Sequence, residues 1–105
     1  MPMHSVDAKT LKSWLEKDEA VLVDVREANE HAEARIPGAT LAPLSQFLPE
    51  GIPLVKRKKL VIHCLAGKRG ATACQKLLSA FPDIDVYNLE GGLSAWIEAG
   101  GEVRN

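Results

Sequence analysis

Short apolar runs that alternate with helical segments constrain this chain more than any other feature of its sequence. Three such runs predict buried strands, at 21–25, 60–64 and 86–89. Strands that are apolar on both faces are typical of parallel sheets, because helices cover both sides of such sheets. The sequence therefore predicts an α/β domain built on a parallel sheet.

Helical patterns and turn residues fill the rest of the chain. We expect four helices, from residue 8 to the Lys17-Asp18 pair, from 27 to about 34, over 70–80 and over 93–99. We also expect a short strand over 40–42 and a helical turn over 45–48. Ser5 or Asp7 can cap the first helix. The stretch 36–39 predicts a turn, since Pro37 fixes φ and Gly38 allows a positive φ.

Length, composition and charge limit the class of protein. With 105 residues the chain has no room for a second core, so we expect one domain spanning 1–105. Hydrophobic residues at 46% and charged residues at 26% exclude a disordered, collagen-like or coiled-coil protein. The net charge of −1 lacks the basic excess that nucleic-acid binding requires.

Cysteine usage and apolar run lengths bear on the compartment. Cys64 and Cys74, the two cysteines of the chain, cannot form a disulfide framework or a four-cysteine zinc site, which points to a reducing compartment. No apolar run approaches the roughly 18 residues of a membrane helix, and the first residues lack the apolar region of a signal peptide. We therefore expect a cytoplasmic protein with no membrane partner and no metal.

A strand, a loop and a helix meet at Cys64. This residue ends the 60–64 strand, and in parallel sheets ligands bind beyond the carboxyl ends of strands. The loop leads into the start of the next helix, where unpaired backbone N–H groups and the helix dipole favour an anion. The loop consists of Leu65, Ala66, Gly67, Lys68, Arg69 and Gly70. Its glycines let successive N–H groups turn inward as a nest, and its two cations add positive charge.

The same features predict a reactive Cys64 and an inert Cys74. Hydrogen bonds to a charged group contribute about 1.5 to 3 kcal/mol each, so two N–H donors from the loop stabilise a thiolate without a separate base. The alternative is that Cys64 is a small buried hydrophobic residue. That alternative does not explain why a loop with glycines and two cations follows it. Cys74 lies on the apolar face of the 70–80 helix with Leu77 and Leu78, which indicates core packing.

The length of the loop separates two kinds of thiolate chemistry. A tyrosine-phosphatase-type pocket has five residues between its cysteine and its arginine, whereas four residues separate Cys64 from Arg69. One residue contributes up to about 3.5 Å of chain, so the shorter ring is tight for phosphate. It fits one additional sulfur atom on Cys64 better, which favours a persulfide cradled by backbone N–H groups.

Motifs along nearly the whole chain resemble the landmarks of a single rhodanese homology domain. They are Asp24-Val25-Arg26-Glu27, Glu30, Ile36-Pro37-Gly38-Ala39, the Cys-x-x-Gly-x-Arg loop from Cys64 to Arg69, and Leu89-Glu90-Gly91-Gly92-Leu93-Ser94-Ala95-Trp96. The resemblance implies a five-stranded parallel sheet with helices on both faces. It also implies a ping-pong sulfurtransferase, in which Cys64 takes the outer sulfur of thiosulfate or a related donor and passes it to cyanide or a thiol.

Two departures from the family pattern bear on the substrate. Many members have Gly-His before Ile-Pro-Gly-Ala, where this chain has Ala34-Arg35. The two-domain enzymes carry a basic residue two places after their cysteine, where this chain has Ala66. Thiosulfate is therefore expected to act as a surrogate for another small anionic donor.

Several polar residues are predicted to support the loop or to line its mouth: Asp24, Arg26, Thr72 and Glu90. Asp24 is expected to anchor loop N–H or hydroxyl groups, and Arg26 to line the mouth. Arg69 either binds the donor or braces the loop through Asp24, Glu27 or Glu90, and the sequence leaves both open.

Two histidines near these motifs are assigned no chemistry. His31 is expected to be solvated in its charged helical turn. The side chain of His63 is expected to point away from Cys64 and to make a structural hydrogen bond, because neighbouring strand residues face opposite sides of a sheet.

Two alternatives to a sulfurtransferase remain open at the level of sequence. One is a phosphatase or arsenate reductase that uses the same thiolate and anion nest. The other is a non-catalytic module that senses sulfur or redox state through Cys64. No cofactor is predicted beyond the covalently carried sulfur. The expected partners are a small anionic sulfur donor, a thiol or cyanide acceptor and a sulfur-relay protein.

Overall fold

Five parallel strands form one sheet at the centre of the domain. The computed structural model describes residues 3–105 and contains β1 (Met3–Val6), β2 (Ala20–Asp24), β3 (Thr40–Leu41), β4 (Lys59–His63) and β5 (Val86–Leu89). The strands lie in the order β1-β5-β4-β2-β3, and every neighbouring pair is parallel. The expected five-stranded parallel sheet is thus confirmed.

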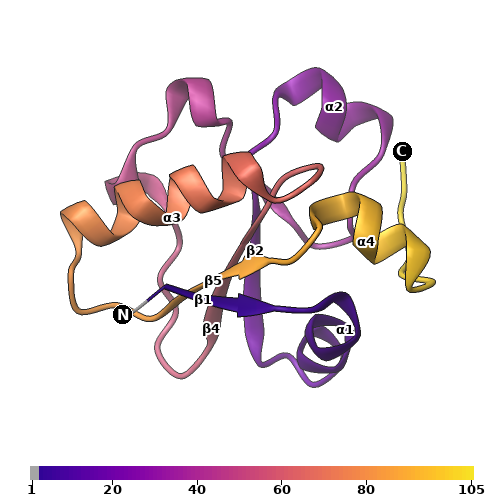
Figure 1. The fold of residues 1–105 in the computed structure, drawn as a ribbon, viewed down its shortest axis with the longest axis horizontal. Helices are drawn as coiled ribbons and strands as arrows, with labels where there is room; N and C mark the ends of the chain where they lie inside the picture. Colours follow the sequence, from indigo (N-terminus) through magenta and orange to yellow (C-terminus); the bar gives the residue numbers. More distant parts are fainter. Residues whose placement is uncertain (1–2) are drawn as a thin grey trace.

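Helices cover both faces of this sheet (Figure 1). They are α1 (Ala8–Glu16), α2 (Ala28–Glu33), α3 (Lys68–Ala80) and α4 (Gly92–Glu98). On one face, α3 packs on β4 and β5 over a cluster that includes Ile62, Cys64 and Leu77. On the other face, α1 and α4 enclose a second cluster that includes Leu11 and Trp96. Apolar surface on both faces explains why the three central residues of β4, Leu60, Val61 and Ile62, are all apolar.

The element boundaries differ from those expected by one or two residues, with one larger difference at the N-terminus. The first strand, β1, was not expected, because its sequence Met-His-Ser-Val buries only Val6. It exists because its backbone pairs with β5 at the edge of the sheet. Asp7, and not Ser5, caps α1 by accepting a hydrogen bond from the Thr10 N–H at 2.8 Å.

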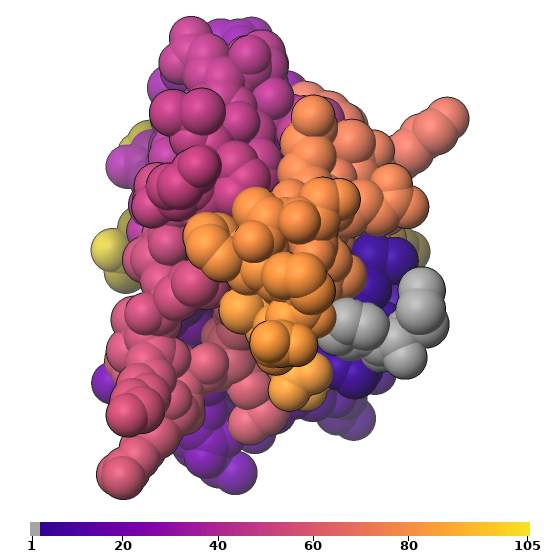
Figure 2. All heavy atoms as spheres, turned by 90° about the vertical axis from the view of Figure 1, so that its left-hand side faces the viewer, coloured from indigo at the N-terminus to yellow at the C-terminus, as the bar shows by residue number. Residues whose placement is uncertain are grey.

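A long segment between β3 and β4 contains the 3-10 turns η1 (Leu44–Gln46) and η2 (Pro49–Gly51). Figure 2 shows this part of the chain, in magenta and pink, running along one side of the molecule. Ile52 is 6% exposed and fixes the segment in the core beneath α3. The expected turn over 45–48 corresponds to η1, which begins one residue and ends two residues earlier. No helix within residues 3–105 has both the length and the apolar character needed to cross a membrane.

Truncating a leucine in the α1 face should measure how much that layer stabilises the sheet. Leu11 is fully buried, so Leu11→Ala is expected to lower the free energy of unfolding by about 3 kcal/mol through lost burial and an unfilled cavity. Leu54 is 48% exposed, so Leu54→Ala is expected to change the free energy of unfolding by less than about 0.5 kcal/mol. Urea unfolding of both variants checks this, and equal losses would contradict the layer assignment.

Candidate active site

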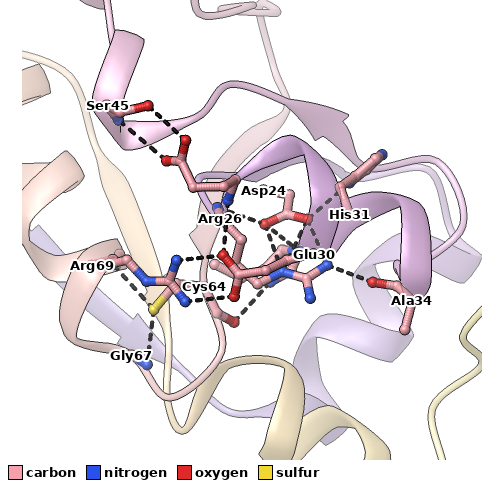
Figure 3. A network of polar contacts seen from close by, with 12 residues as sticks. Asp24, Arg26, Glu30, His31, Ala34, Ser45, Cys64, Gly67 and Arg69 are labelled. Atoms are coloured by element: carbon pink, nitrogen blue, oxygen red, sulfur yellow. Dashed lines mark hydrogen bonds and ion pairs between the residues drawn. The ribbon is translucent and has the colours of Figure 1, made fainter.

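The sulfur of Cys64 lies on the amino-terminal end of α3. Cys64 directly follows β4, and its Sγ accepts hydrogen bonds from the backbone N–H groups of Gly67 at 3.0 Å and Gly70 at 3.3 Å. The residue is 1% exposed. The predicted arrangement of strand, nest and helix start is therefore present, and it places two N–H dipoles on the sulfur (Figure 3).

Glycines at two positions shape this loop. Gly67 is the residue before the first turn of α3 and has a φ of +112°, which side-chain-bearing residues rarely adopt. Gly70 lies in the first turn, where a Cβ atom would overlap the Oδ1 atom of Asn88. Both N–H donors to the sulfur are therefore glycines, one favoured by its backbone conformation and the other by its contact with the Asn88 side chain.

The start of α4 closes the other side of the loop. The N–H groups of Leu93 and Ser94 donate to the carbonyl oxygens of Cys64 and Leu65 at 2.8 and 3.1 Å. A Cβ atom on Gly92 would lie 2.5 Å from the Cys64 carbonyl oxygen, so this glycine allows the close approach. The turn formed by Gly91 and Gly92 is thus part of the wall of the site.

A shallow pocket of about 430 Å³ opens above the sulfur. It is lined by Cys64, Leu65, Ala66, Lys68, Arg69 and Thr72. Leu65 is 44% exposed and forms an apolar part of the rim, while Lys68 contributes an exposed cation. The pocket therefore offers an anion access to the sulfur from one side.

Arg69 is held by Glu30, a partner that the sequence did not indicate for it. The two terminal nitrogens of Arg69 donate to the two carboxylate oxygens of Glu30 at 2.7 and 3.0 Å. This hydrogen-bonded pairing lowers the pKa of Glu30 to about 2 and raises the pKa of Arg69 above its ordinary value. The expected bracing by Asp24, Glu27 or Glu90 is wrong in its partner, and Arg69 braces the loop through Glu30.

A buried polar cluster fixes α2, the helix that carries Glu30. Asp24 is fully buried and accepts hydrogen bonds from Arg26 at 2.8 Å and from His31 at 2.8 Å. Arg26 also donates to the carbonyl oxygen of Ala34 at 2.6 Å. Burial alone would raise the pKa of Asp24, but the hydrogen bonds from Arg26 and His31 outweigh it and hold that pKa below its usual range.

Three expectations about this cluster are corrected by the structure. Asp24 does not anchor the loop, because its oxygens are taken by Arg26 and His31. Arg26 does not line the mouth, since it is 3% exposed and turned towards Asp24. His31 is not solvated, because the end of α2 packs over Asp24 and leaves its side chain 17% exposed.

His63 lies behind Cys64, within hydrogen-bonding distance of the Cys64 carbonyl group. It is fully buried, and its Nδ1 is 3.1 Å from the carbonyl oxygen of Cys64, which agrees with the expected structural hydrogen bond. Its Nε2 is 3.8 Å from Asp24 and has no hydrogen-bond partner in the described part of the chain. Burial lowers the pKa of His63 below its ordinary value.

The remaining predicted residues have smaller roles. The Thr72 hydroxyl donates to the Lys68 carbonyl oxygen at 3.3 Å, a local bond at the start of α3, and the residue also lines the pocket. Glu90 is exposed, does not line the pocket, and uses its N–H to pair with Val6. Cys74 is fully buried, and burial raises the pKa of its thiol to about 12, in agreement with its predicted place in the core. Among residues 3–105 no three His, Cys, Asp or Glu side chains are grouped to hold a metal.

Known proteins and solved structures are similar to this chain over most of its length. The model of the rhodanese-like domain matches residues 7–99. An uncharacterized protein of Synechocystis is 38% identical over 91% of this chain, which spans 53% of that protein's length. The putative sulfurtransferase YtwF of Bacillus subtilis is 33% identical over 91% of this chain and 92% of its own length. A rhodanese-like domain protein from Staphylococcus aureus has a similar structure, with a TM-score of 0.79, 32% identity, and coverage of 98% of this chain and all of that one.

The pairing of Glu30 with Arg69 should give the stability of the domain a specific pH dependence. Because the pKa of Glu30 is lowered from 4.5 to about 2, its contribution is complete above about pH 4.5 and is lost as the pH falls towards 2. Glu30→Gln is expected to lower the free energy of unfolding by about 1 kcal/mol at pH 7 and by much less near pH 2, where about half of the Glu30 carboxyl groups are protonated.

Urea unfolding of this variant at several pH values checks the effect. Glu33→Gln provides the matched control, since Glu33 is an exposed glutamate on the same helix. A loss in Glu30→Gln that persists unchanged at pH 2 would show that the ion pair is not its cause.

Proposed function

The chain belongs to the rhodanese-like domain family, and from this premise we propose that it is a sulfurtransferase that carries a sulfane sulfur on Cys64. The observation that carries the proposal is the pair of N–H groups from Gly67 and Gly70 on the Cys64 sulfur. The name of the Bacillus subtilis relative, a putative sulfurtransferase, supports the same activity.

In the first half-reaction the Cys64 thiolate attacks the outer sulfur of a donor such as thiosulfate. A bond forms between Sγ and that sulfur, and the bond between the outer and central sulfur atoms of the donor breaks. Sulfite leaves with the electron pair of the broken bond, and Cys64 becomes a persulfide anion.

In the second half-reaction an acceptor removes the outer sulfur. Cyanide or a thiolate attacks it, the bond to Sγ breaks, and Sγ takes the electron pair and becomes a thiolate again. The products are thiocyanate or the persulfide of the acceptor. The enzyme returns to its starting state, so the kinetics are of the ping-pong type.

The start of α3 supplies the positive potential for both sulfur species. In addition to the two N–H groups on Sγ, the N–H groups of Lys68 and Arg69 belong to the first turn, where no carbonyl oxygen of the helix can accept from them. These dipoles are fixed before the reaction and stabilise a negative sulfur without rearranging. They are the donors available to the outer sulfur of a persulfide.

The position of Arg69 favours sulfur over phosphate transfer. In a phosphatase-type pocket the arginine binds phosphate oxygens with both arms of its guanidinium group, whereas in this chain Glu30 occupies both arms. The loop is also one residue shorter than a phosphatase loop requires. A tetrahedral oxyanion would have to displace Glu30 and widen the ring.

The pocket suggests the class of substrate. Lys68 attracts a small anionic donor. Because position 66 is an alanine and not a basic residue, thiosulfate serves as a surrogate for another small anionic donor. The acceptor is a thiol, and the exposed rim at Leu65 admits the thiol of a sulfur-relay protein. Free thiols at Cys64 and Cys74 fit a reducing compartment, which we propose is the cytoplasm.

Intact mass spectrometry tests the persulfide directly. After incubation with thiosulfate the wild-type protein is expected to gain one sulfur, about 32 Da, and cyanide is expected to remove it, because the nest stabilises a persulfide on Cys64. Cys64→Ser should gain nothing and lose turnover with its fold intact. Cys74→Ser is the matched control and should keep most of the activity, since Cys74 lies in the core.

The donor series separates the competing functions. A gain with thiosulfonates but not with thiosulfate would keep the chemistry and change the donor. No gain with any donor would refute sulfur transfer and favour the phosphatase-like or the sensing function.

A further inference from the structure

Asn88 is a half-buried polar residue of β5 that lies beside the apolar core on the α3 side of the sheet, beneath the active-site loop. It lies on β5 with Ile62 of β4 as its register partner. Side chains alternate along a strand, so Asn88 shares its face with Val86, which packs in the α3-side core with Ile62 and Cys64. Burying part of an amide against this core costs free energy unless the amide makes a useful contact.

The side chain of Asn88 touches both residues that donate to the sulfur. Its Nδ2 donates to the Gly67 carbonyl oxygen at 3.0 Å. Its Oδ1 is buried, has no hydrogen-bond partner in the described chain, and fills the space that a Cβ on Gly70 would need. One side chain therefore fixes the position of Gly67 and lies against Gly70, while the N–H groups of the same two glycines bind Sγ.

The contact with Gly67 is not required for hydrogen-bond satisfaction. The Gly67 carbonyl oxygen already accepts from the Ala71 N–H at 3.1 Å, in the first turn of α3. Asn88 adds a second donor that ties the residue with the +112° φ to the rigid centre of the sheet. The orientation of the amide is also set, because turning it over would place Oδ1 against the Gly67 carbonyl oxygen.

We propose that Asn88 is a positioning residue that holds the Gly67 and Gly70 N–H groups on the Cys64 sulfur. It acts through the loop and does not touch the substrate. This inference rests on the proposed function, because the N–H groups of Gly67 and Gly70 are taken to stabilise the reactive sulfur. The contact between Asn88 and the loop does not depend on which sulfur donor the enzyme uses.

The test is the pH profile of Cys64 alkylation by iodoacetamide, followed by mass spectrometry. In Asn88→Ala the donor to Gly67 is lost, and the profile is expected to move to higher pH, with a rate at pH 7 about tenfold below wild type. Asn88→Asp keeps the shape of the side chain but adds a negative charge beneath the sulfur, and its profile should move further. Tyr87→Phe is the control on the same strand, since Tyr87 packs on the opposite face.

Circular dichroism and thermal melting establish that each variant is folded at the temperature of the assay. A profile of folded Asn88→Ala that coincides with wild type would overturn the proposal. Unfolding of both Asn88 variants would also overturn it, because Asn88 would then support the whole domain and not the loop. Alkylation of Cys64 does not involve sulfur transfer. The alkylation profile therefore tests the role of Asn88, and the thiosulfate experiment tests sulfur transfer, so that each proposal can fail without the other.

Discussion

Two backbone N–H groups on a single sulfur atom determine how the rest of this domain is arranged. For Gly67 and Gly70 to reach Cys64, the end of β4 and the start of α3 must meet through a loop that turns sharply at Gly67. That loop is stable only if its outer side is packed, and α4 supplies this through Leu93 N–H on the Cys64 carbonyl oxygen. The parallel sheet brings these elements together, because it places the carboxyl end of every strand at the same edge.

A chain of polar contacts holds the loop from the side of β2. It begins at the buried Asp24, passes through His31 to α2, and continues from Glu30 to Arg69. Burying Asp24 and Arg26 together is costly, and the cost is offset because each is hydrogen-bonded to a partner within the cluster. The cations of the cluster are therefore engaged in holding elements in place and are not available to a substrate.

The sequence was sufficient for the parts of the site that are local in the chain. The strand end at Cys64, the two loop glycines and the helix start are consecutive, so their geometry could be predicted from spacing. The role of Glu30 could not, because α2 reaches the loop only through the pairing of β2 with β4. Asn88 was missed for the same reason, since its neighbour Gly67 is 21 residues away. The edge strand β1 carries no apolar run and is defined by its pairing with β5.

The source of the positive potential explains why an uncharged residue suits the underside of the loop. Arg69 is matched by Glu30 and Arg26 by Asp24, so the positive potential around the sulfur comes from the backbone dipoles and from Lys68 at the rim. In the proposed reaction the sulfur centre carries one negative charge as a thiolate and one negative charge as a persulfide. The N–H donors of the loop can therefore keep the same positions in both states. A charged residue beneath the loop would alter that balance. The amide of Asn88 fixes the donors without adding a charge, which is what a cradle serving two anions of equal charge requires.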